Sequence, residues 1–248
     1  GVKLPLEIIT SCDSPPGSGL GSSSTLVVSM LEAYRQLMSL PLGEYDIAHL
    51  AYEIEREDCG LAGGKQDQYA ATFGGFNFIE FSDKDRVIVN PLRIRRHILN
   101  ELESSMILFY TGQSRDSDTI INDQVESLEQ SDGSALAAMH EVKKASYVFK
   151  ELLLRGDIYG LAHQFRQAWN DKKATSKSIT NHMIDELERS ILTEGALSMK
   201  VSGAGGGGFV IIFVDPEKKY HVIKMLSDMS GHVQEFQFVT EGAISWTV

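Results

Sequence analysis

A short segment dense in glycine and serine constrains this chain more than any other feature. Residues 17–24 read Gly-Ser-Gly-Leu-Gly-Ser-Ser-Ser and stand between an expected strand at residues 6–11 and a helix expected to start at Ser22. Glycine lets the backbone take positive φ and approach a ligand closely. The helix that follows offers free N–H groups and a positive dipole end to an anion. We therefore predict a phosphate-binding turn at residues 15–24, called here the first glycine loop.

The same residues also allow a plainer interpretation, a tight turn followed by a serine N-cap. Three glycines and four serines within eight residues favour the phosphate site. The loop is not a Walker A motif, because no Gly-Lys-Ser/Thr follows it. It lacks the Gly-x-Gly-x-x-Gly spacing of a dinucleotide fingerprint, and no acidic residue ends a second strand about 20 residues on.

Charge and hydropathy exclude several classes of partner. Acidic residues outnumber basic ones by 34 to 23, which argues against a nucleic-acid-binding face. An anionic substrate must therefore be captured by local donors. No apolar run approaches the roughly 20 residues that span a bilayer, and no signal peptide opens the chain. We expect a cytoplasmic protein without a membrane partner, and we expect Cys12 and Cys59 to be reduced thiols.

Apolar periodicity and turn residues divide the chain into a first unit at residues 1–103 and a second unit at residues 104–248. In the first unit they predict helices at residues 22–38, 42–58 and 64–72, and a hairpin of residues 76–81 and 86–90. In the second they predict strands at residues 106–110, 197–201, 209–214 and 233–240, and helices at residues 117–129, 134–154, 157–169, 181–193 and 216–229.

A second glycine run, Gly-Ala-Gly-Gly-Gly-Gly at residues 203–208, stands between two of these strands. Residues 15–25 and residues 200–209 (the second glycine loop) together resemble the two glycine loops of the GHMP kinases, such as galactokinase, homoserine kinase and mevalonate kinase. The resemblance implies an α+β, two-domain GHMP-kinase-like fold. Residues 1–103 would be an incomplete N-terminal domain, lacking about ninety residues that family members carry, and residues 104–248 a ferredoxin-like α/β sandwich. It also implies ATP as the phosphate donor, bound by Pro16, Gly17, Ser18, Gly19, Leu20, Gly21, Ser22, Ser23, Ser24, Gly203, Ala204 and Gly205.

Phosphoryl transfer to a hydroxyl needs charge neutralisation, usually by Mg²⁺, and a group that positions or deprotonates the acceptor. Residues 64–68, Gly-Lys-Gln-Asp-Gln, resemble the Gly-x-x-Asp motif of the family, which makes Asp67 the implied base or acceptor-positioning carboxylate. Glu55, followed by Arg56, resembles the family's Mg²⁺ ligand. Ser23 would complete the metal site, with its two serine neighbours as alternatives.

The predicted acceptor contacts are Asp67, Arg115 and Gly205. Arg115 follows an expected strand, and its planar guanidinium suits a phosphate, although an exposed structural arginine is an equal alternative. Lys172 and Lys173 are ambiguous in the same way, and we expect them on the surface.

Residues 42–48, 62–71 and 73–77 resemble the sugar-kinase branch of the family. The implied reaction transfers the ATP γ-phosphate to the anomeric hydroxyl of D-glycero-D-manno-heptose 7-phosphate. Two alternatives stay open: another GHMP sugar kinase of the fucose or galactose type, and a nucleotide-binding module without turnover. The oligomeric state is also open, with a homodimer as one alternative.

Overall fold

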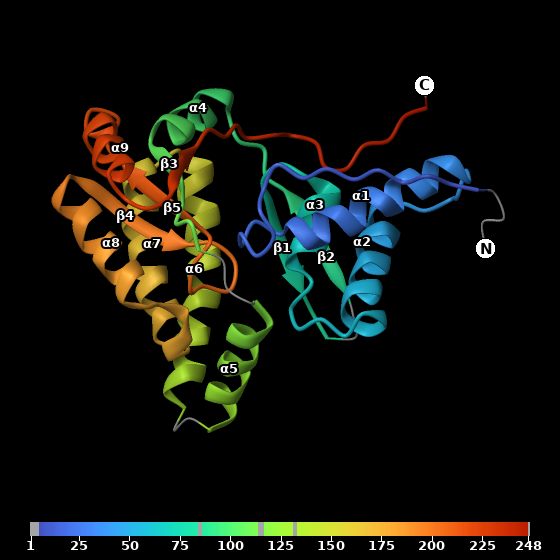
Figure 1. The fold of residues 1–248 in the computed structure, drawn as a ribbon, viewed down its shortest axis with the longest axis horizontal. Coiled ribbons are helices and arrows are strands. Elements are labelled where there is room, and N and C mark those ends of the chain that lie inside the picture. Colours follow the sequence, from blue (N-terminus) through green and yellow to red (C-terminus); the bar gives the residue numbers. More distant parts are fainter. Residues whose placement is uncertain (1–4, 84–85, 114–116, 131–132, 248) are drawn as a thin grey trace.

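The computed structural model describes residues 5–83, 86–113, 117–130 and 133–247. In the first part of the chain, helices pack beside a β-hairpin (Figure 1). Val28, Ile47 and Ala51 are buried where the first two helices meet. In the hairpin the strands are antiparallel, and Ile79 faces Val89. The elements are α1 (Ser22–Leu37), α2 (Glu44–Glu53), a π-helical turn (Ile54–Asp58), α3 (Gln66–Phe73), β1 (Asn77–Phe81) and β2 (Val87–Pro91).

The second part of the chain is built on an antiparallel sheet with the strand order β4-β5-β3-β6. Helices lie before and between its strands, and strands distant in sequence, such as β3 and β5, are neighbours in the sheet. The elements are α4 (Arg96–Ser104), β3 (Met106–Tyr110), α5 (Ser117–Gln130), α6 (Ser134–Arg155), α7 (Ile158–Lys173), a 3₁₀ turn (Lys177–Ile179), α8 (His182–Thr193), β4 (Ala196–Val201), β5 (Phe209–Val214), α9 (Lys219–Ser227) and β6 (His232–Gln234).

Strand β5 shows why helices cover both faces of this sheet. Because side chains alternate along a strand, Val210 and Ile212 join the cluster formed with α8 and α9, whereas Phe213 joins the cluster formed with α4, α6 and α7. Almost every residue of β5 is buried, and full burial of one large apolar side chain stabilises the fold by about 1.5–3 kcal/mol. Two antiparallel sheets with their helices make this an α+β chain, as expected.

The end of the chain crosses back over the first part. The backbone N–H of Ala243 donates to the carbonyl of Ala71 at 3.0 Å, and the hydroxyl of Ser245 donates to Glu32 Oε1 at 2.8 Å. Figure 1 shows this segment, drawn in red, running over α3 and α1. The division of the chain at residues 103 and 104 stays a prediction.

The prediction of a strand at residues 6–11 was wrong. The segment is extended beside α1, but none of the described residues pairs with it as a strand. A β-strand is held by hydrogen bonds to a neighbouring strand, and here the neighbour is a helix. A cavity of about 460 Å³ lies between this segment and α1.

The strand predicted at residues 233–240 is much shorter, because β6 ends at Gln234. Beyond it the N–H of Phe238 donates to Glu103 Oε1 at 2.7 Å, and the Phe238 ring packs edge-on against Phe76. The backbone N–H of Phe238 is thus bonded to a side-chain carboxylate and not to the backbone of a neighbouring strand. Helix α4 was not predicted, although Ile98 and Leu102 stand one turn apart and are both buried. No helix in the described ranges is both long enough and apolar enough to cross a membrane.

Candidate active site

The first glycine loop ends at an uncapped helix N-terminus. Gly17, Gly19 and Gly21 all have positive φ, of 70°, 79° and 71°. Gly21 is the N-cap residue of α1, and no side chain caps the helix there. The predicted alternative of a serine N-cap is therefore wrong. The first N–H groups of α1 are left free to bind an anion.

The second glycine loop donates hydrogen bonds to two backbone carbonyls of the first glycine loop. Ser202 Oγ donates to the carbonyl of Gly19 at 2.8 Å, and the N–H of Phe209 donates to the carbonyl of Ser18 at 2.8 Å. The contact leaves no room for a side chain, since a Cβ on Gly203 would lie 2.7 Å from Gly19 Cα. Loops more than 180 residues apart in sequence therefore form one junction.

The second glycine loop is fixed from behind by other segments. The N–H of Gly206 donates to the carbonyl of Ile179 at 2.9 Å, and Asn181 Nδ2 donates to the carbonyl of Gly206 at 2.9 Å. Gly205 is buried against Ile179, whereas Gly203 is exposed at the junction. Of the three predicted ligand-binding residues in this loop, Gly203 and Ala204 are thus the more accessible.

A buried carboxylate lies beside the first glycine loop. Glu55 is only 2% exposed and belongs to the π-helical turn that follows α2. Its Oε1 accepts from Ser23 Oγ at 2.6 Å, and its Oε2 accepts from Gln68 Nε2 at 2.5 Å. The fold therefore brings together the two residues predicted to bind metal. Among the alternatives to Ser23, Ser24 is buried and Ser22 lines the cavity beside residues 6–12.

Asp67 lies in the first turn of α3 and faces the same loop. A Cβ on Gly21 would lie 3.2 Å from Asp67 Cγ. Burial raises the pKa of Asp67, Arg56 acts to lower it, and the neighbouring carboxylate of Glu55 raises it further. Arg56 also donates to the carbonyl of Ala62 at 3.0 Å, which holds the segment that leads into α3.

The donor atoms here fit Mg²⁺. Among the described residues no group of three or more His, Cys, Asp or Glu side chains could hold a metal ion by itself. Magnesium in phosphate-transfer sites uses only one or two carboxylates, with water and substrate phosphates as its other ligands. A serine hydroxyl and a glutamate carboxylate at hydrogen-bond distance supply hard oxygens of that kind.

The remaining predicted residues differ in whether the structure describes them and in how exposed they are. Arg115 lies outside the described residues. Pro16, Gly17 and Leu20 are exposed on the first glycine loop, whereas Ser18 is fully buried and joins the two loops through its carbonyl.

Lys172 is half-exposed, and it contacts the second glycine loop, a contact not predicted from the sequence. Its ammonium donates to the carbonyl of Gly203 in the second glycine loop. Burial, together with the charge of Lys200, lowers the pKa of Lys172 to about 7, and burial also lowers the pKa of Lys200. Phe165 and Trp169 precede Lys172 at helical spacing, and this pattern could have indicated that it faces inward.

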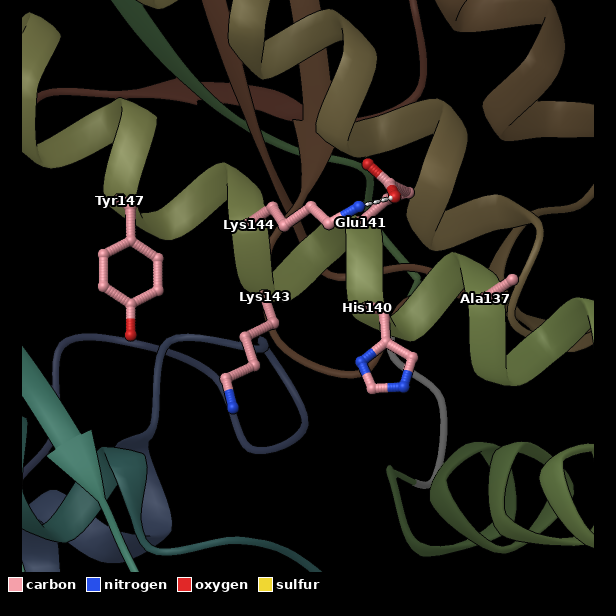
Figure 2. Close-up of a pocket in the computed structure, with 6 residues that line it drawn as sticks. All are labelled: Ala137, His140, Glu141, Lys143, Lys144 and Tyr147. Carbon is pink, nitrogen blue, oxygen red and sulfur yellow. Dashed lines mark hydrogen bonds and ion pairs between the residues drawn. The ribbon is translucent and has the colours of Figure 1, made fainter.

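An open cavity of about 490 Å³ lies on one face of helix α6. Figure 2 shows His140, Lys143 and Tyr147 pointing to one side of the helix, while Lys144 turns to Glu141, with which it forms an ion pair. Every polar side chain on this face is solvent-exposed. The face therefore lacks the burial seen at the two loops.

Enzymes that transfer a phosphoryl group from a nucleoside triphosphate hold the phosphates on backbone N–H groups and neutralise them with Mg²⁺. The free N–H groups at the start of α1 and the paired Ser23 and Glu55 oxygens would fit such a site. Residues 1–75 match the GHMP kinases N terminal domain, and residues 149–230 match the GHMP kinases C terminal domain. The chain belongs to the GHMP kinase family, which confirms the expected fold and the expected enzyme class.

Similar proteins include sugar kinases. The chain is 48% identical over 245 residues to D-glycero-alpha-D-manno-heptose 7-phosphate kinase of Campylobacter jejuni, covering 99% of this chain and 72% of that protein. A solved D-glycero-D-manno-heptose 1-phosphate kinase from Bacteroides thetaiotaomicron has 42% identity and a TM-score of 0.77, with 95% of this chain and 66% of that one covered. A solved sugar kinase from Campylobacter jejuni, described as putative in its name, has 48% identity and a TM-score of 0.74, with coverage of 93% and 65%.

Proposed function

We propose that this kinase transfers the γ-phosphate of ATP to the anomeric hydroxyl of D-glycero-D-manno-heptose 7-phosphate. The observation that carries the proposal is the position of Asp67, an exposed carboxylate beside the first glycine loop whose pKa is raised by partial removal from water and by the neighbouring Glu55 of the Ser23–Glu55 pair. An acceptor hydroxyl between Asp67 and the loop would meet the phosphate that the loop holds.

In this proposal each residue has a separate task. The N–H groups at the start of α1 and the glycines of the loop bind the nucleotide phosphates. Ser23 and Glu55 would hold Mg²⁺, which when bound neutralises the charge of the phosphate oxygens. Asp67 accepts a hydrogen bond from the acceptor hydroxyl and orients it. As the oxygen forms its bond to the γ-phosphorus and the bond to ADP breaks, the hydroxyl proton passes to the Asp67 carboxylate.

The pKa of Asp67 suits this task. Proton transfer is most effective when the pKa of the base lies near the working pH. Burial and Glu55 move the pKa of Asp67 upward, in the direction of neutrality. Positioning and electrostatics supply most of the catalysis in phosphoryl transfer, so orientation of the hydroxyl is the larger part of its role.

The names of the similar proteins support a heptose phosphate but differ in the position of the phosphate. One is named for heptose 7-phosphate and the other for heptose 1-phosphate. We favour the 7-phosphate as substrate, because a free anomeric hydroxyl is then the acceptor. A sugar-phosphate partner and a cytoplasmic location, where ATP is available, belong to the same proposal, and a homodimer stays a prediction.

An acceptor panel tests the proposal. ADP release is measured with heptose 7-phosphate, heptose 1-phosphate, fucose and galactose, each with Mg²⁺ and ATP. We expect turnover on heptose 7-phosphate, with a product whose anomeric proton couples to phosphorus in the NMR spectrum. Turnover on a free hexose and none on the heptose 7-phosphate would favour the fucose or galactose alternative. ATP binding without turnover on any sugar would favour the non-catalytic module.

A further inference from the structure

Two lysines meet at the end of β4, next to the second glycine loop. Lys200 is paired in the sheet with Ile211, and its ammonium lies 5.8 Å from the centre of the Phe165 ring on α7. Lys172 stands two helical turns after Phe165, in the last turn of α7. Both ammonium groups therefore lie between α7 and β4, and that of Lys172 reaches the carbonyl of Gly203.

This lysine pair has no acidic partner in the part of the chain that the structure describes. Each ion pair and hydrogen bond of a described lysine with a carboxylate involves a different lysine. Lys173, the next residue along, is paired by contrast with Glu188 Oε2 at 2.9 Å.

Two neighbouring ammonium groups that are partly removed from water carry a free-energy cost unless an anion compensates it. Lys200 is the one charged group that perturbs Lys172 among the described residues, and it is of the same sign. Nearby on α7, Asp171 instead accepts a hydrogen bond from Gln167 at 3.0 Å. None of the described residues therefore supplies a countercharge to Lys172.

We propose that Lys172, supported by Lys200, binds a phosphate group of a substrate at the junction of the two glycine loops. Gly203 contacts Gly19 of the first glycine loop, so the anchor of Lys172 is part of the surface where the two loops meet. The phosphate belongs either to the nucleotide or to the phosphorylated sugar. The inference rests on the proposed function only in taking these two molecules as the ligands.

Binding of a phosphate dianion would leave a measurable trace in protons. An anion beside Lys172 favours the ammonium form and raises its pKa. Since the pKa without ligand is about 7, roughly nine-tenths of Lys172 is neutral at pH 8, and ligand binding would take up as much as about 0.9 proton. A residue that acted only by supporting the fold would produce no such uptake.

Isothermal titration calorimetry at pH 8, in buffers of different ionisation enthalpy, measures affinity and proton uptake together. The probes are the Mg²⁺ complex of a non-hydrolysable ATP analogue and D-glycero-D-manno-heptose 7-phosphate, each titrated into the full-length protein. For Lys172→Met we expect about a 10-fold or larger loss of affinity for one probe, with loss of its proton uptake. The probe affected identifies the source of the phosphate.

Two variants control this measurement. Lys172→Arg keeps a permanent charge, so it should bind within a few-fold of the unmodified protein while taking up no proton. Lys173→Met removes a paired lysine from the adjacent position and should change neither quantity. A melting curve for each variant identifies any that fails to fold. If Lys172→Met does not fold, the loss of proton uptake in Lys172→Arg is the test.

Wild-type affinity and proton uptake in Lys172→Met would overturn the proposal. A loss of affinity in Lys143→Met with none in Lys172→Met would also overturn it, and would move the phosphate to the open face of α6. A failure of the proposed function can be told apart from a failure of this proposal. If only free hexoses are phosphorylated, the proposed acceptor is wrong. The effect of Lys172→Met on binding of the ATP analogue still decides the role of Lys172.

Discussion

Replacing Asp67 by asparagine should lower activity without lowering stability at pH 8. The substitution keeps the size of the side chain and its place beside Gly21, and it removes only the negative charge and the ability to accept a proton. An amide can still contact the acceptor hydroxyl but cannot take its proton. We therefore expect kcat to fall by about 10²–10⁴-fold, the usual loss for a positioned acid–base group, with little change in ATP binding.

The stability change follows from the pKa of Asp67. Burial raises that pKa above the ordinary value of 3.8, with a smaller upward contribution from Glu55, against the lowering effect of Arg56. A carboxyl with a raised pKa in the folded state adds stability while it is protonated, below its unfolded pKa, and this contribution is lost as the pH rises through the folded pKa. At pH 8 the ionised Asp67 thus opposes folding, and Asp67→Asn should have an equal or higher Tm. At pH 3, where Asp67 is protonated in both states, the difference in Tm should shrink.

The assay combines ADP release at saturating ATP with thermal melts at pH 3 and pH 8. Asp58→Asn is the matched control, because Asp58 is an exposed acid on the adjacent π-helical turn and should change neither quantity. Near-normal kcat in Asp67→Asn would refute the assignment of Asp67 as base or positioning group. A lower Tm at pH 8 would refute the argument from burial.

Other substitutions test the remaining parts of the site. Ser23→Ala should raise the Mg²⁺ concentration needed for half-maximal activity by several-fold, and Glu55→Gln should have the same effect. Glu55→Gln should also lower the pKa of Asp67, seen in the pH profile of kcat/KM, because the charge of Glu55 raises that pKa. Ser202→Ala removes the hydrogen bond to Gly19 and should cost about 1 kcal/mol of unfolding free energy, measured by urea denaturation, with a higher KM for ATP. Gly19→Ala should cost more than Ser202→Ala, because φ is +79° there and its Cβ would lie 2.7 Å from the carbonyl oxygen of Ser202.

The parts of this site that depend on local sequence could be predicted, and those that depend on packing could not. The first glycine loop follows from glycines placed just before a helix, and the hairpin follows from alternation and turn residues. The strand expected at residues 6–11 has the right composition, but a strand also needs a neighbour, and sequence does not show that α1 takes that place. The contact of Lys172 was missed for a related reason: it depends on Gly203, which lies 31 residues further along the chain.

The contact between the two glycine loops explains why glycine is needed in both. The hydrogen bonds at Ser18 and Gly19 use backbone carbonyls as acceptors, so the distance between the loops is set mainly by main-chain atoms. A main-chain contact of this closeness leaves no space for a Cβ at Gly203. The N–H groups that begin α1 therefore keep a fixed position relative to the second loop, although α1 and β4 belong to parts of the chain with separate sheets. Preorganisation of this kind is what phosphoryl transfer requires, because its catalysis depends on donors that are already in place when charge develops on the phosphate.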